Sequence, residues 1–68
     1  MEIPKWTGEL IGKMHNNRIS SLDLAKSMGV CKDYVSMVLN GKKTPKGAQE
    51  RFEAAVDAII AERREANV

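Results

Sequence analysis

The chain is poor in the residues that give many small proteins cross-links, metal sites or catalytic groups. Its 68 residues include one cysteine and one histidine, and its aromatic residues are one tryptophan, one tyrosine and one phenylalanine. A single cysteine excludes an internal disulfide and fits a reducing compartment. His15 has no second histidine or cysteine at ligand spacing, so we expect no metal site. No serine has a histidine and an acid as partners, so we expect no catalytic nucleophile.

Long apolar runs are also lacking. No segment approaches the roughly 20 apolar residues of a membrane-spanning helix, and the first residues lack the apolar core of a signal peptide. We therefore expect a cytoplasmic protein that makes no membrane contact. A chain of this length buries a marginal core and offers few walls for an enzymatic pocket. We expect a binding module that is not an enzyme, with no cofactor and no small-molecule ligand.

The segment from residue 20 to residue 46, SSLDLAKSMGVCKDYVSMVLNGKKTPK, predicts two short amphipathic helices joined by a turn. Ser20, with Asp23 three residues later, is a short form of the capping box that begins a helix. Gly29 adopts left-handed backbone without steric cost and ends that helix. An Asn-Gly pair ends the second helix. The apolar residues at helical spacing are Leu24, Ala25 and Met28, then Val35, Val38 and Leu39.

The second helix of this segment begins near Cys31 or Lys32 and has two different sides. At about 100° per residue, its apolar residues gather on one side, which faces the core. The residues turned away from the core are Lys32, Asp33, Ser36 and Met37, with Tyr34 at the edge. The basic residues Lys42, Lys43 and Lys46 follow, and Pro45 prevents the helix from continuing. In helix-turn-helix proteins, such an outward side enters the major groove of DNA.

Two further helices are predicted, one from about Pro4 to His15 and one from about Gly47 to Ala66. Thr7 is a competing cap for the first of them, and Asn16-Asn17 closes it. The sequence thus predicts a compact all-α bundle of four or five helices. We expect Ile19 to pack inward and Val30 to plug the corner after Gly29. The expected core contains Leu10, Met14, Leu24, Ala25, Met28, Val30, Val35, Val38, Leu39, Phe52, Val56 and Ile59.

The basic residues are unevenly distributed along the chain. Residues 1–47 carry eight Lys or Arg and four Asp or Glu, a net charge of +4, whereas residues 48–68 carry three and five, a net charge of −2. The positive excess therefore accompanies the two short helices and the lysine-rich loop. This distribution is typical of a surface that binds nucleic acid.

The spacing of several short motifs resembles that of the Cro/C1-type (XRE-like) regulators of phages and mobile elements. The chain has Leu24-Ala25, then Gly29-Val30, then Asn40-Gly41-Lys42, with Pro45 in step. The resemblance covers about 30 of the 68 residues. It implies a lambda-repressor-like fold, with residues 1–68 as a single helix-turn-helix domain and the helix-turn-helix at about residues 20–40. It also implies sequence-specific binding of double-stranded DNA by a transcriptional regulator, a repressor.

The chain departs from the family pattern at a few positions. Cys31 stands where a serine or threonine usually caps the recognition helix, and Leu39 stands where a glutamate is common. Asp33 and Met37 replace the glutamine or arginine typical of the reading side. These departures leave the predicted fold unchanged, but the family pattern does not define the DNA sequence that this chain would read or how specific its binding is.

The spacing and the resemblance together assign the DNA contacts. The expected base-reading residues are Lys32, Asp33, Ser36 and Met37. The expected phosphate contacts are Ser21, Tyr34, Asn40, Lys42, Lys43 and Lys46, helped by backbone N–H groups around Asn40-Gly41 and at the start of the last helix. For Tyr34, phosphate contact, groove contact and partial burial are equal alternatives. Met37 either touches a thymine methyl group or lies exposed on a surface with another use.

Two alternatives remain open at this stage. Because Asp33 on the reading side repels phosphates, the module could instead contact proteins, as an antitoxin or an adaptor with weak or non-specific DNA binding. The second concerns assembly: Ile60 and Ala61 on the last helix could form a weak homodimer, or the chain could be a monomer in free solution. The sequence does not define the operator, repression against activation, or the physiological signal.

Overall fold

The computed structural model describes residues 3–66, and the described residues form four α-helices and no strand. The helices are α1 (Lys5–Asn16), α2 (Ser21–Met28), α3 (Lys32–Leu39) and α4 (Ala48–Ala66). They make a compact all-α globule that measures 43 × 21 × 18 Å. The sequence predicted four or five helices, and four is correct for the described residues. Residues 1, 2, 67 and 68 of the predicted domain lie outside the described residues.

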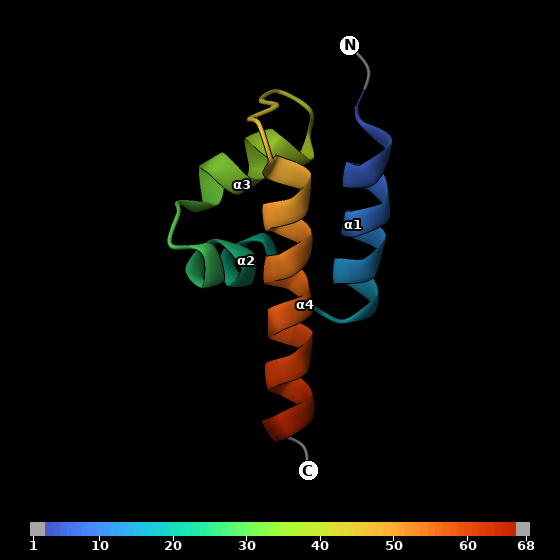
Figure 1. Cartoon of the computed structure of the whole chain (residues 1–68), viewed down its shortest axis with the longest axis vertical. Coiled ribbons are helices and arrows are strands. Elements are labelled where there is room, and N and C mark those ends of the chain that lie inside the picture. Colours follow the sequence, from blue (N-terminus) through green and yellow to red (C-terminus); the bar gives the residue numbers. More distant parts are fainter. Residues whose placement is uncertain (1–2, 67–68) are drawn as a thin grey trace.

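The long helix α4 organises the molecule. It runs along the longest axis, with α1 on one side and the α2–α3 pair on the other (Figure 1). Both α1 and α2 contact α3 as well as α4, so each short helix has two packing partners. The C-terminal half of α4 extends beyond the α2–α3 pair and past the end of α1 (Figure 1). None of the described helices is long and apolar enough to cross a membrane.

The predicted signals at the ends of α2 are confirmed. The Ser20 hydroxyl accepts a hydrogen bond from the Asp23 backbone N–H at 3.1 Å, and the Asp23 carboxylate accepts one from the Ser20 N–H at 3.0 Å. Gly29 ends the helix with a φ of 71°. This left-handed conformation turns the chain from α2 toward α3 at little steric cost.

The start of α1 differs from one of the two predicted starts. The helix begins at Lys5, directly after Pro4, and Thr7 lies within its first turn. Thr7 is fully buried, and its hydroxyl donates a hydrogen bond of 2.7 Å to the Pro4 carbonyl. The threonine therefore satisfies a buried polar group within the helix instead of capping a later start.

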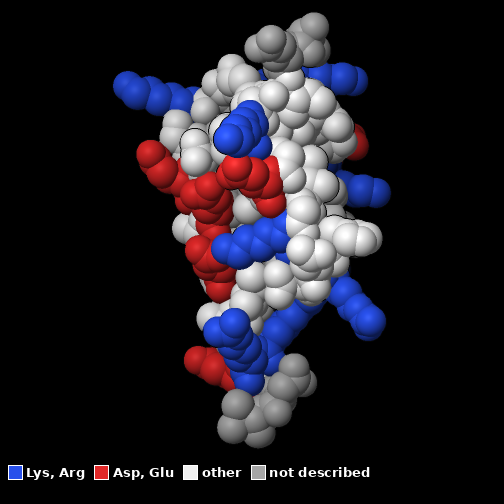
Figure 2. Space-filling view, turned by 90° about the vertical axis from the view of Figure 1, so that its right-hand side faces the viewer, with Lys and Arg blue, Asp and Glu red and all other residues white. Residues whose placement is uncertain are grey.

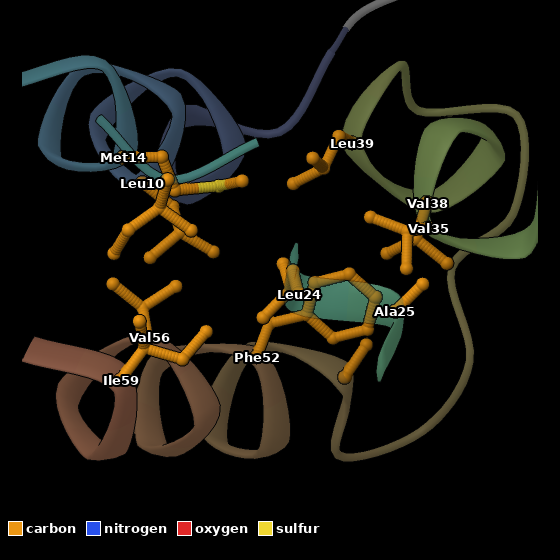
Figure 3. Close-up of a cluster of buried hydrophobic side chains, with 12 residues drawn as sticks. Leu10, Met14, Leu24, Ala25, Val35, Val38, Leu39, Phe52, Val56 and Ile59 are labelled. Carbon is orange, nitrogen blue, oxygen red and sulfur yellow. The ribbon is translucent and has the colours of Figure 1, made fainter. Parts of the chain in front are cut away.

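The core lies where the four helices meet, with Phe52 of α4 near its centre (Figure 3). Leu10 and Met14 of α1 face Val56 and Ile59 of α4 (Figure 3). The buried hydrophobic residues are Leu10, Met14, Ile19, Leu24, Ala25, Val35, Val38, Leu39, Ala48, Phe52, Val56 and Ile59.

Ten of the twelve predicted core residues are buried, and Met28 and Val30 are the exceptions. Both pack against the core but remain partly exposed. Met28 is the last residue of the short helix α2, and Val30 follows the turn at Gly29, so both lie at the edge of the α2–α3 corner. Ile19 and Ala48 complete the buried set in their place.

Candidate nucleic-acid interface

The α2–α3 pair is held at a fixed angle by a three-residue connection. The Val30 backbone N–H donates to the Ala25 carbonyl at 3.0 Å, which closes the turn after Gly29. The Val30 side chain packs against the core, as the sequence predicted for the corner. Cys31 occupies the N-cap position of α3, and its side chain makes no capping hydrogen bond. The short connection therefore fixes α3 through backbone hydrogen bonds and apolar packing.

Helix α3 has one buried side and one outward side. Its apolar residues Val35, Val38 and Leu39 are at most 5% exposed. On the outward side, Lys32 and Asp33 are exposed, whereas Ser36 and Met37 are partly exposed. The structure thus brings all four predicted base-reading residues to the accessible part of α3.

Tyr34 lies at the edge of the outward side and is partly buried. Its ring is 6.4 Å from the ring of Phe52, with an interplanar angle of 48°. Among the three roles considered for this residue, partial burial therefore applies, although the side chain is still accessible in part. Packing on Phe52 also ties the first turn of α3 to α4.

Three predicted contact residues surround one hollow of about 330 Å³. Ser21 comes from the first turn of α2, Ser36 comes from α3, and Asn40 is the C-cap residue of α3. Ile11 and His15 of α1 also line the hollow. The Asn40 amide donates to the Ser36 hydroxyl at 3.2 Å. The start of α2 and one flank of α3 therefore border the same depression, and α1 contributes its other wall.

The lysines after α3 are accessible, but the backbone N–H groups from Asn40 to Lys43 are already hydrogen-bonded within the protein. Lys42, Lys43 and Lys46 are all exposed. The N–H groups of Lys42 and Lys43 both donate to the Met37 carbonyl, at 2.8 and 3.2 Å. Those of Asn40 and Gly41 donate to carbonyls of α3 as well. The expectation that these N–H groups help to hold a phosphate was wrong, because they close the C-terminal end of α3.

Lys43 lies apart from the hollow that Ser21 borders. It lines a second hollow of about 230 Å³ with Trp6 and Pro45. Gly41, with a φ of 76°, approaches the N-terminal segment so closely that an added Cβ would lie 3.3 Å from the Ile3 Cα. The lysine-rich loop therefore lies against the segment just before α1 and against Trp6 in the first turn of α1.

The acidic residues gather on another part of the surface. Glu9 and Lys13 of α1 line a hollow with Glu53 and Asp57 of α4, and the Lys13 ammonium group is 2.5 Å from the Asp57 carboxylate. Figure 2 shows acidic side chains gathered along one side of this face, next to a large uncharged area. The acidic groove between α1 and α4 is thus separate from the outward side of α3.

The structure lowers the pKa of Asp23. The Ser20 backbone N–H and then the Ser20 hydroxyl hold the pKa of this carboxyl group below its ordinary value, and Arg63 and Lys26 act in the same direction. The carboxylate thus stays ionised at the N-terminal end of α2, where a negative charge is favourable.

Sequence reasoning missed the role of Arg63. Its guanidinium group donates to the carbonyls of Asn17 and Arg18 and pairs with the Asp23 carboxylate. One signal was available: Phe52, Val56, Ile59 and Arg63 follow at spacings of four, three and four residues, so Arg63 extends the buried stripe of α4. Within the described residues, no group of three His, Cys, Asp or Glu is placed to hold a metal ion.

Comparison of the chain with models of protein families, with curated proteins and with solved structures found no match in any of the three.

Proposed function

We propose that this chain is a cytoplasmic regulator that binds double-stranded DNA with a lambda-repressor-like helix-turn-helix of the Cro/C1 type. In this proposal α2 and α3 are the two helices of the motif, and α3 enters the major groove. The chain acts by binding alone, without catalysis or a cofactor. The observation that carries the proposal is the arrangement of α3: it buries one side in the core and leaves Lys32 and Asp33 exposed on the other.

The surroundings of α3 support the same function. Ser21 at the start of α2 and the lysine-rich loop after α3 lie at opposite ends of the motif in sequence, and all of them are at least partly accessible. In a groove-bound helix, phosphate contacts from such flanking groups fix the orientation, whereas contacts from the helix itself read the bases. Lys32 favours guanine O6 or N7, Asp33 accepts from cytosine N4, and Met37 prefers a thymine methyl group.

Salt dependence tests the phosphate contacts. Binding to a fluorescent duplex is titrated at several salt concentrations for the wild type and for Lys42→Ala, Lys43→Ala and Lys46→Ala. Each lost contact should flatten the log–log slope by about one unit, with little change in sequence preference. Lys26→Ala is the matched control, because Lys26 is also exposed but lines the hollow between α2 and α4, away from Ser21. Unchanged slopes for all three loop variants would refute the phosphate assignment.

Selection of bound sites from random duplexes tests base reading. We expect the wild type to enrich one motif, and Lys32→Ala and Met37→Gln to enrich altered motifs. Each reader should contribute on the order of 1–3 kcal/mol of discrimination. If the wild type and both variants enrich the same motif, the outward side of α3 does not read the bases.

A weak dimer that forms on DNA, with α4 nearest the two-fold axis, would allow this small domain to bind two half-sites. Ile60 is partly buried against the core, so changing it also affects stability. Ala61 is exposed beside it and lines the same hollow of about 430 Å³. Ala61→Glu should therefore weaken cooperative binding to a palindromic site while sparing a half-site and the fold. Equal affinity of the variant and the wild type for the palindrome would place the dimer contact elsewhere.

The second candidate function is protein recognition, as in an antitoxin or an adaptor. The exposure of Asp33 next to Lys32 favours it, because a carboxylate at this position repels phosphate groups. The two functions differ in their response to salt: DNA binding weakens steeply as salt is added, whereas an apolar protein contact does not. Failure to enrich any DNA sequence, together with a flat salt response, would favour the protein-binding function.

A further inference from the structure

The last turns of α4 reach back to the beginning of α2 through one side chain. Arg63 Nη1 donates to the Asn17 carbonyl and, at 3.1 Å, to the Arg18 carbonyl, while Nη2 lies 3.5 Å from the Asp23 carboxylate. These partners are 40 to 46 residues away in the sequence. One guanidinium group therefore joins α4, the α1–α2 connection and the first turn of α2.

The connection that Arg63 contacts has an uncommon backbone conformation. Arg18 has a φ of 56°, the only positive value at a non-glycine residue within the described part of the chain. Left-handed backbone is unfavourable for a residue with a Cβ, so it persists where the surrounding structure determines it. Here Ile19 is buried on one side, and its N–H donates to Met14 at 2.8 Å. The Arg63 guanidinium group also holds this connection, through the Asn17 and Arg18 carbonyls.

Asp23 gives this contact a second consequence. Its carboxylate lies in the first turn of α2, two residues from Ser21, and would repel a phosphate bound there. The pair with Arg63 compensates that charge, and the side chains of both residues are a little over two-fifths exposed. The contact therefore fixes the backbone at the start of α2 and offsets the negative charge beside it.

We propose that Arg63 is a positioning residue for the DNA interface: it holds the α1–α2 connection and Asp23 so that Ser21 can donate to a phosphate. This inference rests on the proposed function, because Ser21 matters in this way only if the chain binds DNA. It assigns to the C-terminal end of α4 an influence on DNA affinity without any contact between Arg63 and DNA.

The test compares Arg63→Met with Arg64→Met at a fixed salt concentration, on a duplex that carries a single half-site, because Arg64 lines the same hollow as the proposed dimer residue Ala61. Arg64 is the next residue of the same helix, is exposed, and its replacement removes the same charge. Both variants therefore lose the same long-range attraction to DNA. Arg63→Met should bind a duplex roughly tenfold more weakly than Arg64→Met, the effect of about one charge-assisted hydrogen bond. Equal affinities of the two variants would overturn the inference.

Coupling to Ser21 separates positioning from a general loss of structure. Ser21→Ala should weaken duplex binding in the wild type and in Arg64→Met, but should have little further effect in Arg63→Met. If Ser21→Ala costs the same factor in every background, Arg63 does not act through Ser21 and the inference is wrong. Arg63→Lys keeps the charge but has one nitrogen in place of Nη1 and Nη2, so it cannot bridge the two carbonyls and the Asp23 carboxylate as the guanidinium group does. It should therefore show the same lost coupling even if Arg63→Met does not fold.

Measurements without DNA distinguish the two proposals. Amide hydrogen exchange at Ile19 and Asp23 should be faster in Arg63→Lys than in the wild type or in Arg64→Met. Unchanged exchange would overturn the positioning role, even if the wild type binds DNA. If exchange responds as expected but the wild type shows no salt-dependent binding to a duplex, the proposed function fails, and the role of Arg63 at a DNA interface fails with it.

Discussion

Two glycines with nearly the same positive φ allow a sharp test of how the end of α3 is supported. Gly29 and Gly41 have φ values of 71° and 76°. A Cβ added to Gly29 would meet no atom within 4 Å, whereas one added to Gly41 would lie 3.3 Å from the Ile3 Cα and the Pro4 Cδ. Replacement by alanine therefore imposes the same backbone cost at both positions, but crowds the N-terminal segment at only one.

The expected losses follow from this difference. Left-handed backbone costs a residue with a Cβ about 1–2 kcal/mol, and alanine returns about 0.4–1 kcal/mol by restricting the unfolded chain. Gly29→Ala should therefore lower the unfolding free energy by about 1 kcal/mol. Gly41→Ala should lose about 1 kcal/mol more, because backbone atoms of the N-terminal segment must move to admit the methyl group.

Urea unfolding followed by circular dichroism measures both losses, with the slope m as a check that the unfolded state is unchanged. Asparagine separates the two contributions, because it tolerates left-handed backbone but still has a Cβ. Gly29→Asn should be nearly neutral, and Gly41→Asn should retain about 1 kcal/mol of loss from crowding. Equal losses at the two positions in both series would refute the contact between Gly41 and the segment Ile3–Pro4.

Three further predictions concern stability. Phe52→Ala should lower the unfolding free energy by about 3–5 kcal/mol, because the ring is fully buried and lies 6.0 Å from the ring of Trp6. A loss below about 1 kcal/mol in urea unfolding would contradict the central position of Phe52 in the core. The low pKa of Asp23 stabilises the fold at neutral pH, and this contribution should be lost as the pH falls below about 4. The unfolding free energies of the wild type and Asp23→Asn should therefore converge in acid. A difference that stays constant with pH would contradict this prediction. Cys31→Ser should stabilise α3 by about 0.5–1 kcal/mol by supplying the missing N-cap acceptor, and an unchanged urea midpoint would argue against an open cap.

The sequence predicted the helices well because their signals are local. The capping box of Ser20 and Asp23, the left-handed Gly29 and the apolar spacing of α3 each act within a few residues. Such signals determine where a helix begins and which side it buries, whatever the rest of the chain does. The same reasoning brought Lys32 and Asp33 to the outward side of α3, where the structure has them exposed.

The failures concern groups whose partners are decided by close tertiary geometry. Free N–H groups were expected after α3, yet Lys42 and Lys43 both donate to Met37, since the tight turn at Gly41 directs them to the end of the helix. The left-handed conformation of Arg18 had no signal in its residue type, because arginine has no special tendency toward it. In both cases the backbone conformation depends on tertiary packing, and the spacing of residues in the sequence does not predict it.

Arg63 shows why the stripe of α4 changes from apolar to charged at its last member. The stripe first meets side chains of the core, at Phe52, Val56 and Ile59. One turn later it meets the end of α1, where helix carbonyls have no partner within their own helix and need donors. An apolar residue at position 63 would leave the Asn17 and Arg18 carbonyls without these hydrogen bonds, whereas a guanidinium group fills the place and satisfies both. The charge at the end of α4 is therefore dictated by the backbone that it faces, and the position of α2 depends on it.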